Sequence, residues 1–341
     1  MKSIISIAQV AAALALSAPQ LPAHATTITT FDVPGATYTG PKGINRDGTI
    51  AGQYHVANGC EQGFVRAPDG TITKFDPQGT LGLSRAVVAG INDAGDVAGY
   101  YYACQGSQGP WGFIRAADGT VITYDPPAGS SFFTVYGINN AGTVLAGFSS
   151  DVQHGLLRTA DGQITIFDAG YSTLPAAIAN NGSITGLIVD QSYAGHGFLR
   201  DAQGNVTSFD VPGSLSTSGL VINAKNAIAG NYFVVGGERH GFVRAADGTL
   251  TLFDPPGSLA TYPRGINIHG AVAGTWSDNK SILNHSFIRS GSGRLLTFNP
   301  PGAVSSFWNA INSVGSVAGD YVTSDGLTHG YVRNPIPWTV R

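Results

Sequence analysis

The strongest constraint on the fold is a motif that recurs along the whole chain. A Phe or Tyr residue followed by Asp or Asn occurs seven times, at intervals of 42 to 49 residues. The copies are Phe31-Asp32, Phe75-Asp76, Tyr124-Asp125, Phe167-Asp168, Phe209-Asp210, Phe253-Asp254 and Phe298-Asn299. A Gly-Ile-Asn segment and a His-Gly-Phe-x-Arg segment recur in phase with it. A fixed period of this length indicates a repeat architecture.

Each repeat unit reads as four short strands, a to d. Strand a ends in Gly-Ile-Asn, strand b is the Val-Ala-Gly-x-Tyr segment, strand c is Gly-Phe-Val-Arg, and strand d leads into the Phe-Asp corner. Asn-x-x-Gly and Ala-x-Asp-Gly turns separate a from b and c from d. Four strands in each of seven units predict an all-β, seven-bladed β-propeller. Only 11% of residues are charged and 47 are Gly, which suits many tight turns.

The two ends of the chain complement each other. Residues Thr27–Asp32 supply a strand d without its unit, whereas the last unit ends at strand c, Tyr331–Arg333. We therefore expect the N-terminal strand to pair with the C-terminal blade and close the ring, which removes the exposed edges of an open array.

The first 25 residues resemble a secretory signal. Lys2 precedes an apolar stretch at 4–16, and Ala23-His24-Ala25 fits a small-x-small cleavage site. The alternative, a membrane anchor, needs a longer apolar stretch. We expect cleavage near Ala25 and a single secreted or periplasmic domain at 26–341, monomeric and without a membrane span. Cys60 and Cys104 stand one repeat apart, so either a disulfide or two separate thiols fits, and no metal-binding spacing accompanies them.

The repeated motifs resemble those of the HAF-repeat family of extracellular bacterial proteins. The motif copies that carry the resemblance are His154-Gly155-Leu156, His196-Gly197-Phe198, His240-Gly241-Phe242, His285-Ser286-Phe287 and His329-Gly330-Tyr331, together with the Gly-Ile-Asn segments. Gly or Ser stands where the family has Ala. The resemblance implies secretion and a repeat fold, and it brings no established activity.

The recurring His, Arg and Asp residues favour a structural role. A catalytic constellation is needed once, whereas these residues recur in almost every unit, in outer strands that diverge around a ring. Loop residues Asp151, Asp190, Asp278 and Asp325 leave open a carboxylate pair for glycoside hydrolysis. No nucleophile elbow, zinc-protease or nucleotide-binding motif is present.

Loop lengths point to the face where a site would lie. The a–b and c–d turns are nearly constant in length, while the b–c and d–a loops vary; we call the side that carries the b–c and d–a loops the variable face. Two residues before the strand-a Ile, the units carry chemically unlike residues: Lys42, Ala89, Tyr136, Ala176, Leu220, Arg264 and Asn309. This ring should border the central channel, where Lys42, Tyr136, Arg264 and Asn309 would form a polar or anion-binding site. Arg85, Phe133, Tyr262 and Trp308 would add contacts.

These patterns favour an exported, non-enzymatic binding module whose partner is an extracellular ligand or protein, glycans included. Tyr100–Tyr102, Trp111 and Trp276 near the b–c loops could stack on sugars or pack between blades. A net charge of −3 without a basic run argues against nucleic acid. No cofactor or metal is implied. An extracellular hydrolase or lyase of a polysaccharide or small metabolite, and a structural envelope protein, remain alternatives.

Overall fold

The computed structural model describes residues 27–335 apart from 58, 106–107 and 279–282, and within β26 also leaves out the side chains of Trp308 and Asn309. The proposed signal segment at 1–25 therefore lies outside the described residues. Within them the chain forms 28 strands and no helix, so the all-β expectation is confirmed. It follows that no helix in this part of the chain is long and apolar enough to span a membrane.

The strands follow the repeat, and each unit contributes one strand of each kind. The a strands are β2 (Ala36–Ile44), β6 (Ser84–Ile91), β10 (Phe132–Ile138), β14 (Ser172–Ile178), β18 (Ser216–Ile222), β22 (Ser258–Ile266) and β26 (Ser305–Ile311). The b strands are β3 (Ile50–Val56), β7 (Val97–Ala103), β11 (Val144–Ser149), β15 (Ile184–Val189), β19 (Ile228–Phe233), β23 (Val272–Asp278) and β27 (Val317–Val322). The c strands are β4 (Gln62–Arg66), β8 (Trp111–Arg115), β12 (Gln153–Arg158), β16 (Gly195–Arg200), β20 (Arg239–Arg244), β24 (Asn284–Arg289) and β28 (Thr328–Arg333). The d strands are β5 (Ile72–Phe75), β9 (Val121–Tyr124), β13 (Ile164–Phe167), β17 (Val206–Phe209), β21 (Leu250–Phe253), β25 (Leu295–Phe298) and β1 (Ile28–Phe31).

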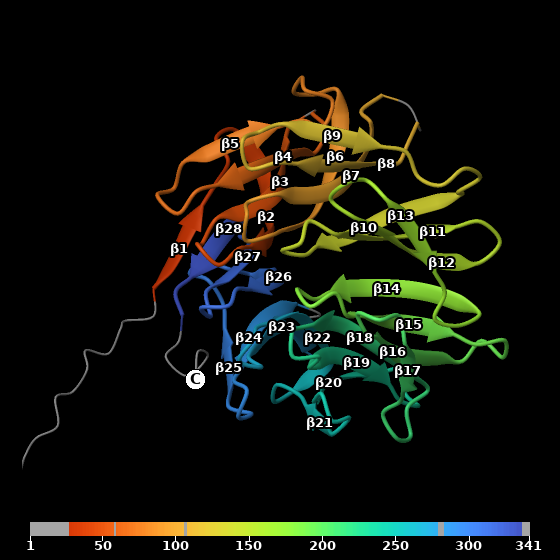
Figure 1. Cartoon of the computed structure of the whole chain (residues 1–341). Coiled ribbons are helices and arrows are strands. Elements are labelled where there is room, and N and C mark those ends of the chain that lie inside the picture. Colours follow the sequence, from red (N-terminus) through yellow and green to blue (C-terminus); the bar gives the residue numbers. More distant parts are fainter. Residues whose placement is uncertain (1–26, 58, 106–107, 279–282, 336–341) are drawn as a thin grey trace, which may run out of the picture.

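The first strand of the chain lies beside the last. β1 pairs antiparallel with β28, with Ile28 opposite Arg333 and Phe31 opposite Gly330. In Figure 1 the red β1 accordingly lies next to the blue β28. The N-terminal strand thus takes the d position of the C-terminal unit.

The hydrogen-bonded strands form four separate sheets of 8, 4, 12 and 4 strands rather than one continuous ring. Single-residue parallel bridges, such as Gly195 opposite Ser216, join neighbouring units within the two larger sheets. Between sheets the contact is made by side chains and by main-chain hydrogen bonds such as that from Ala86 N to the Glu61 carbonyl oxygen at 2.8 Å. The a strands nevertheless contact one another in series, from β2 through β6, β10, β14, β18, β22 and β26 back to β2.

The repeated glycines are explained by packing within a unit. A Cβ on Gly63 of β4 would lie 2.1 Å from the ring of Phe75 on β5, and one on Gly52 of β3 would lie 2.4 Å from the carbonyl oxygen of Gly40. Neither distance is sterically tolerable, so only glycine lets these strands approach. The Phe of the His-Gly-Phe motif is fully buried, as Phe64 and Phe242 show.

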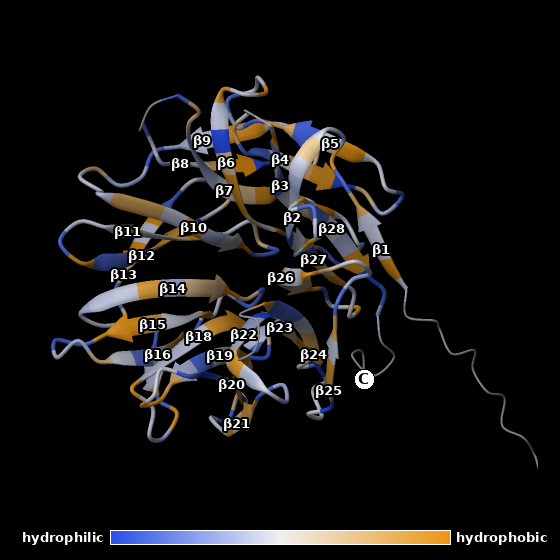
Figure 2. Ribbon diagram, turned by 180° about the vertical axis from the view of Figure 1, so that it is seen from behind, coloured by the Kyte–Doolittle hydropathy of each residue, from blue (hydrophilic) through white to orange (hydrophobic). Residues whose placement is uncertain are grey.

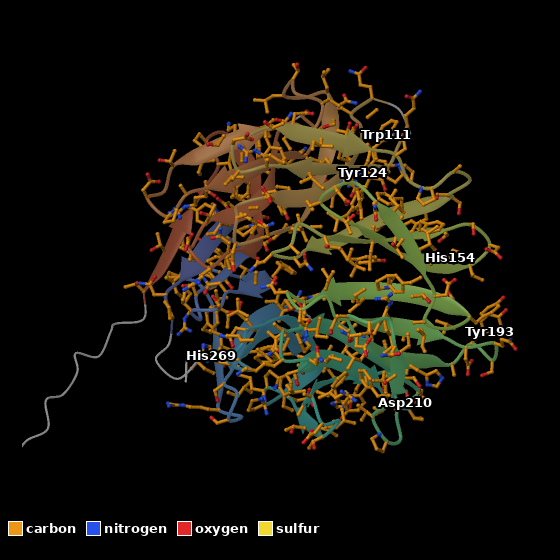
Figure 3. The ribbon with its side chains drawn as sticks, in the orientation of Figure 1. Trp111, Tyr124, His154, Tyr193, Asp210 and His269 are labelled. Carbon is orange, nitrogen blue, oxygen red and sulfur yellow. A yellow bond between two sulfur atoms is a disulfide. The ribbon has the colours of Figure 1, made fainter. Side chains whose placement is uncertain are left out.

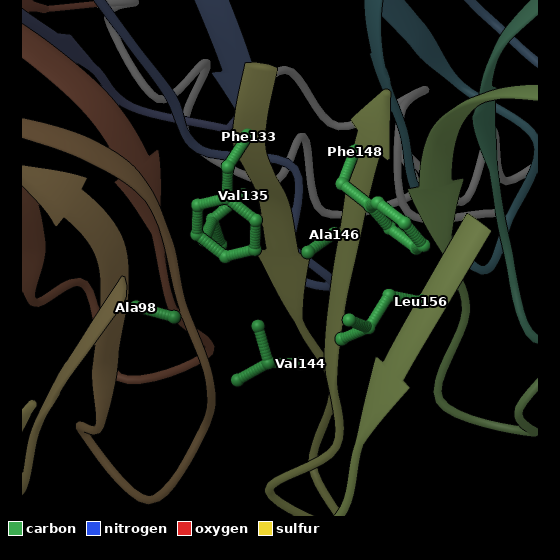
Figure 4. Close-up of a cluster of buried hydrophobic side chains, with 7 residues drawn as sticks. All are labelled: Ala98, Phe133, Val135, Val144, Ala146, Phe148 and Leu156. Atoms are coloured by element: carbon green, nitrogen blue, oxygen red, sulfur yellow. The ribbon is translucent and has the colours of Figure 1, made fainter. Parts of the chain in front are cut away.

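The core is distributed between units. Apolar side chains of adjacent units form several separate clusters, and Figure 2 shows hydrophobic segments on strands all around the molecule. One cluster joins Ala98 of β7 to Val135, Val144 and Leu156 of the next unit (Figure 4). Burial between similar neighbours is how repeat folds are stabilised.

Each c-strand Arg stacks on the d-strand aromatic ring of the preceding unit, at 4.6–5.4 Å from the ring centroid. The seven pairs are Arg66–Phe31, Arg115–Phe75, Arg158–Tyr124, Arg200–Phe167, Arg244–Phe209, Arg289–Phe253 and Arg333–Phe298. Such cation–π contacts stabilise by roughly 0.5–2 kcal/mol each. The repeated Arg therefore joins one unit to the next.

Candidate functional site

Six residues of the predicted ring line one cavity, and three of them are polar. Lys42 of β2, Tyr136 of β10 and Arg264 of β22 come from units far apart in sequence and meet around a volume of about 630 Å³. The remaining wall is mostly apolar: Val87, Val88, Ala89, Val135, Ala176, Ala177, Leu220, Val221 and Pro263, with Gln53, Tyr100 and Thr134 as further polar positions. Two cations beside apolar walls make a pocket that suits an organic anion.

Lys42 lies deep among charged groups. Its Nζ donates a hydrogen bond to the Tyr38 hydroxyl oxygen at 3.3 Å. Burial lowers the pKa of Lys42, the negative charges of Asp320 and Glu61 oppose that effect, and Arg264 adds to the lowering. A pKa below the usual lysine range makes this ammonium readier to exchange a proton than a surface lysine.

Arg264 and Tyr136 are held by aromatic and glycine neighbours. The Arg264 guanidinium lies 5.4 Å from the centroid of the Tyr262 ring, so Tyr262 makes a cation–π contact with Arg264. Tyr136 occupies the space that a side chain at Gly147 would need, since a Cβ there would lie 3.0 Å from its ring. Glycine at that position of β11 therefore leaves room for the tyrosine ring.

Asp320 of β27 is a nearby acidic group that sequence reasoning missed. Its side chain is 2% exposed, and Oδ1 has no hydrogen-bond partner among the described residues. Burial raises the pKa of Asp320 to about 7, and the positive charge of Lys42 partly offsets the rise. The signal was available, because the strand-b position that holds Asp320 also varies between units: Gln53, Tyr100, Gly147, Leu187, Asn231, Thr275 and Asp320.

Arg85 belongs to a different hollow. It lines a volume of about 430 Å³ with Tyr38, His55 and Glu61, and its Nε lies 2.9 Å from Glu61 Oε2. Gln53 Nε2 donates to the other Glu61 oxygen at 3.0 Å, which connects this hollow to the cavity wall. Arg85 is therefore linked to the cavity wall through Glu61 and Gln53.

The sequence left the state of the two cysteines open. The structure bonds Cys60 to Cys104, with Cα atoms 5.9 Å apart. The bridge ties the b–c loop of one unit to that of the next, and Cys60 lies beside Glu61 in the second hollow.

The other predicted contributors have mixed outcomes. Phe133 is 1% exposed and packs in the core between units, so the expectation that it contacts a ligand is wrong (Figure 4). The side chains of Trp308 and Asn309 lie outside those described. Trp276 stacks on His285 and Trp111 on Tyr101, so both rings already have aromatic partners.

The channel also has a mouth on the opposite face. The seven Ile residues that end the a strands line a cavity of about 550 Å³ there, and they line a smaller central one of about 250 Å³ as well. These residues are Ile44, Ile91, Ile138, Ile178, Ile222, Ile266 and Ile311. A ring of isoleucines thus lies between the cavity at the a–b turns and the cavity lined by Lys42, Tyr136 and Arg264.

The recurring His residues pair with the Asp of the Phe-Asp corner. His154, His196 and His240 place Nδ1 at 2.7–2.8 Å from Asp168, Asp210 and Asp254, respectively, and His329 does so with Asp32 at 2.9 Å. Three of the candidate loop carboxylates lie 3.5 Å from the other ring nitrogen, Nε2, of a histidine. Asp151 approaches His154, Asp190 approaches His196, and Asp278 approaches His285. Asp325 instead accepts from Thr323. These pairs recur from unit to unit at strand ends, as a structural role requires.

Comparison with known proteins gives a fold and no family. No protein-family profile and no curated protein matches this sequence. Among solved structures, a streptogramin B lyase is 14% identical with a TM-score of 0.59, covering 91% of this chain and 98% of that one. The β-propeller domain of the trilobed protease from Pyrococcus furiosus is 8% identical, with a TM-score of 0.65 and the same coverage. The BP39L lectin from Burkholderia pseudomallei is 12% identical, with a TM-score of 0.52, covering 84% of this chain and 94% of that one. The chain is therefore all-β and of the β-propeller type.

Proposed function

We propose that this chain is an exported, seven-bladed propeller of the HAF-repeat type that binds a small organic anion without chemically changing it. The ligand would enter from the variable face and occupy the cavity lined by Lys42, Tyr136 and Arg264. The serial contacts of the a strands and the β1–β28 pairing support seven blades closed into a ring. The Cys60–Cys104 bridge supports an oxidising compartment, secreted or periplasmic.

One observation carries the binding proposal. The ring position that differs most from unit to unit places two cations, from units 1 and 6, in a single cavity with apolar walls. A repeat that only stabilised the ring would have no need of unlike residues there. The cavity lies within the range of small-molecule sites, and a carboxylate, phosphate or sulfate attached to an apolar body would satisfy both kinds of wall.

The test is a ligand screen on the mature chain by thermal shift, followed by calorimetry. Aromatic and aliphatic carboxylates, organic phosphates and neutral glycans would be compared. We expect stabilisation by one anion class, and at least tenfold weaker binding in Lys42→Gln and Arg264→Gln. Arg46→Gln, at the opposite mouth of the channel, is the matched control and should bind normally. Binding that survives both cavity substitutions would place the ligand elsewhere.

A second function, an extracellular hydrolase or lyase, has one observation in its favour. Asp320 is buried beside the positive charge of Lys42, and its pKa of about 7 would allow it to exchange protons at neutral pH. Turnover of a ligand found in the screen, abolished by Asp320→Asn with binding retained, would replace the binding-module proposal. If no anion or glycan stabilises the chain, the structural envelope role is favoured instead.

A further inference from the structure

Large exposed apolar side chains are concentrated on one side of the molecule. Among the described residues, ten lie in the loops or first two strand positions of the variable face: Leu81, Leu83, Phe132, Tyr171, Tyr193, Leu215, Val235, Leu259, Val304 and Leu327. Six more lie along the outer d strands, and Val314 stands in an a–b turn on the opposite face. Soluble proteins scatter such residues, so ten against one marks a contact surface.

The three most exposed of these residues lie where units 4 and 5 meet. Val235 is 85% exposed, Tyr193 81% and Leu215 62%. Tyr193 and Leu215 stand two and one residues before the Gly195–Ser216 bridge that joins β16 to β18, so the two loops lie side by side. Figure 3 shows Tyr193 at the outer tip of its loop, on the same side as His154 and Asp210. We call Tyr193, Leu215 and Val235 the loop patch.

Four carboxylates lie near the loop patch along the chain. Asp190 and Asp210 flank His196, and Glu238 and Asp254 flank His240. The first three of these carboxylates stand on the loops that carry the patch, and Asp254 stands on the next d–a loop. Four carboxylates against two histidines leave this region negatively charged at neutral pH, whether or not the histidines are protonated.

The basic side chain in the same region is already engaged. Arg239 lies 3.9 Å from the centroid of the Phe233 ring and 5.6 Å from that of Tyr262. Its guanidinium lies over these two rings, and the four carboxylates outnumber it. The loop patch is therefore an apolar surface inside an acidic frame.

We propose that the loop patch docks a basic polypeptide segment that carries apolar side chains, so that Lys or Arg residues meet the carboxylates while apolar residues cover Tyr193, Leu215 and Val235. Charge complementarity selects this occupant. An anionic lipid surface would also cover apolar loops, but the four carboxylates would repel it. The loop patch is built from the b–c and d–a loops, whereas the anion cavity is built from the a and b strands, so the two sites are independent.

The test uses the mature chain and a fluorescent amphipathic peptide of Lys and Leu, with a Glu and Leu peptide of the same pattern as its partner. Anisotropy should show binding of the Lys peptide that weakens with added salt, and little binding of the Glu peptide. The triple variant Tyr193→Ser, Leu215→Ser, Val235→Ser should bind at least tenfold more weakly. Hydrogen exchange should show protection at 190–196, 213–216 and 233–239.

The control is a triple variant on the outer d strands, Ile122→Ser, Ile164→Ser, Ile166→Ser, whose residues are 48–52% exposed. It removes three exposed apolar side chains outside the loop patch and should bind the Lys peptide normally. Equal loss in both variants, or protection confined to the opposite face, would overturn the proposal. So would sedimentation of the wild-type chain with phosphatidylglycerol vesicles that the loop-patch variant loses, since that result identifies a membrane as the occupant.

Discussion

Asn312 Nδ2 donates a hydrogen bond to the main-chain carbonyl oxygen of Asn45 at 2.9 Å, although the two residues are 267 positions apart. The same bond links Asn92 to Asn139 and Asn223 to Asn267. Within its own unit, the Asn312 Oδ1 accepts from the Ser316 main-chain nitrogen and holds the a–b turn. The repeated asparagine thus stabilises its own turn and donates a hydrogen bond to the next unit. At Asn312 this bond joins the last unit to the first.

Replacing Asn312 by Ala should lower the free energy of unfolding by about 1–3 kcal/mol, because a buried amide and its partners lose their hydrogen bonds. Urea denaturation of the mature chain measures the change. Unit 4 offers a natural comparison, since Ala179 occupies this position there and Asn181 bonds to the Ala224 carbonyl instead. An unchanged midpoint for Asn312→Ala would mean that this hydrogen bond does not stabilise the junction of the last and first units.

Gly63 and Gly137 should respond oppositely to alanine. A Cβ at Gly63 would lie 2.1 Å from Phe75, whereas one at Gly137 meets nothing within 4 Å and has ordinary backbone angles. We expect Gly63→Ala to destabilise by about 1–3 kcal/mol through overpacking and Gly137→Ala to be near neutral. Thermal melting of the two variants compares them directly, and equal losses would contradict the close strand packing.

Asp320 should make the protein less stable as pH rises. Its pKa is about 7 in the folded chain, above the ordinary Asp value, so the folded state holds a proton that the unfolded state releases. Stability from this group is therefore lost between about pH 4 and pH 7. Asp320→Asn should flatten that slope and raise the melting temperature at pH 8 relative to wild type. A slope that is unchanged in the variant would assign it to other groups.

The His196–Asp210 pair should contribute stability at low pH. The hydrogen bond to Asp210 is the main cause that raises the His196 pKa, with burial acting against it. Because the folded pKa exceeds the unfolded value, the contribution is present below the unfolded pKa and is lost as pH rises through the folded pKa. His196→Gln should remove this dependence, as measured by melting temperatures between pH 5 and pH 8. Titration of the His196 ring by NMR gives an independent check, and an ordinary histidine pKa would refute the effect.

Removing the Cys60–Cys104 bridge should lower stability by about 2–4 kcal/mol, because it closes a loop across 44 positions. The variant Cys60→Ser, Cys104→Ser would be compared with wild type by chemical denaturation without reductant. Adding a reductant to wild type should reproduce the loss, whereas no response would indicate that the bridge does not form in solution.

The repeat alone predicted the strands and their order. Each of the three motifs, Gly-Ile-Asn, His-Gly-Phe and Phe-Asp, marks one strand end. They recur because the strands of every unit pack in the same way. The contact of Gly63 with Phe75 and the turn formed by Asn45 involve residues that are close in sequence. They can therefore be predicted from the repeat. The pairing of β1 with β28 could also be expected, since each end supplied what the other lacked.

What only the tertiary structure decided is which unlike residues meet. The variable ring position predicted that Lys42, Tyr136 and Arg264 lie together, and they line one cavity. It did not predict that Arg85 lines a separate hollow or that Phe133 is buried between units. It also missed Asp320, because the charge of a b-strand residue reaches Lys42 only across the junction of the last and first units. Strand pairing follows from local sequence, whereas burial and electrostatic coupling depend on neighbours that are distant in the chain.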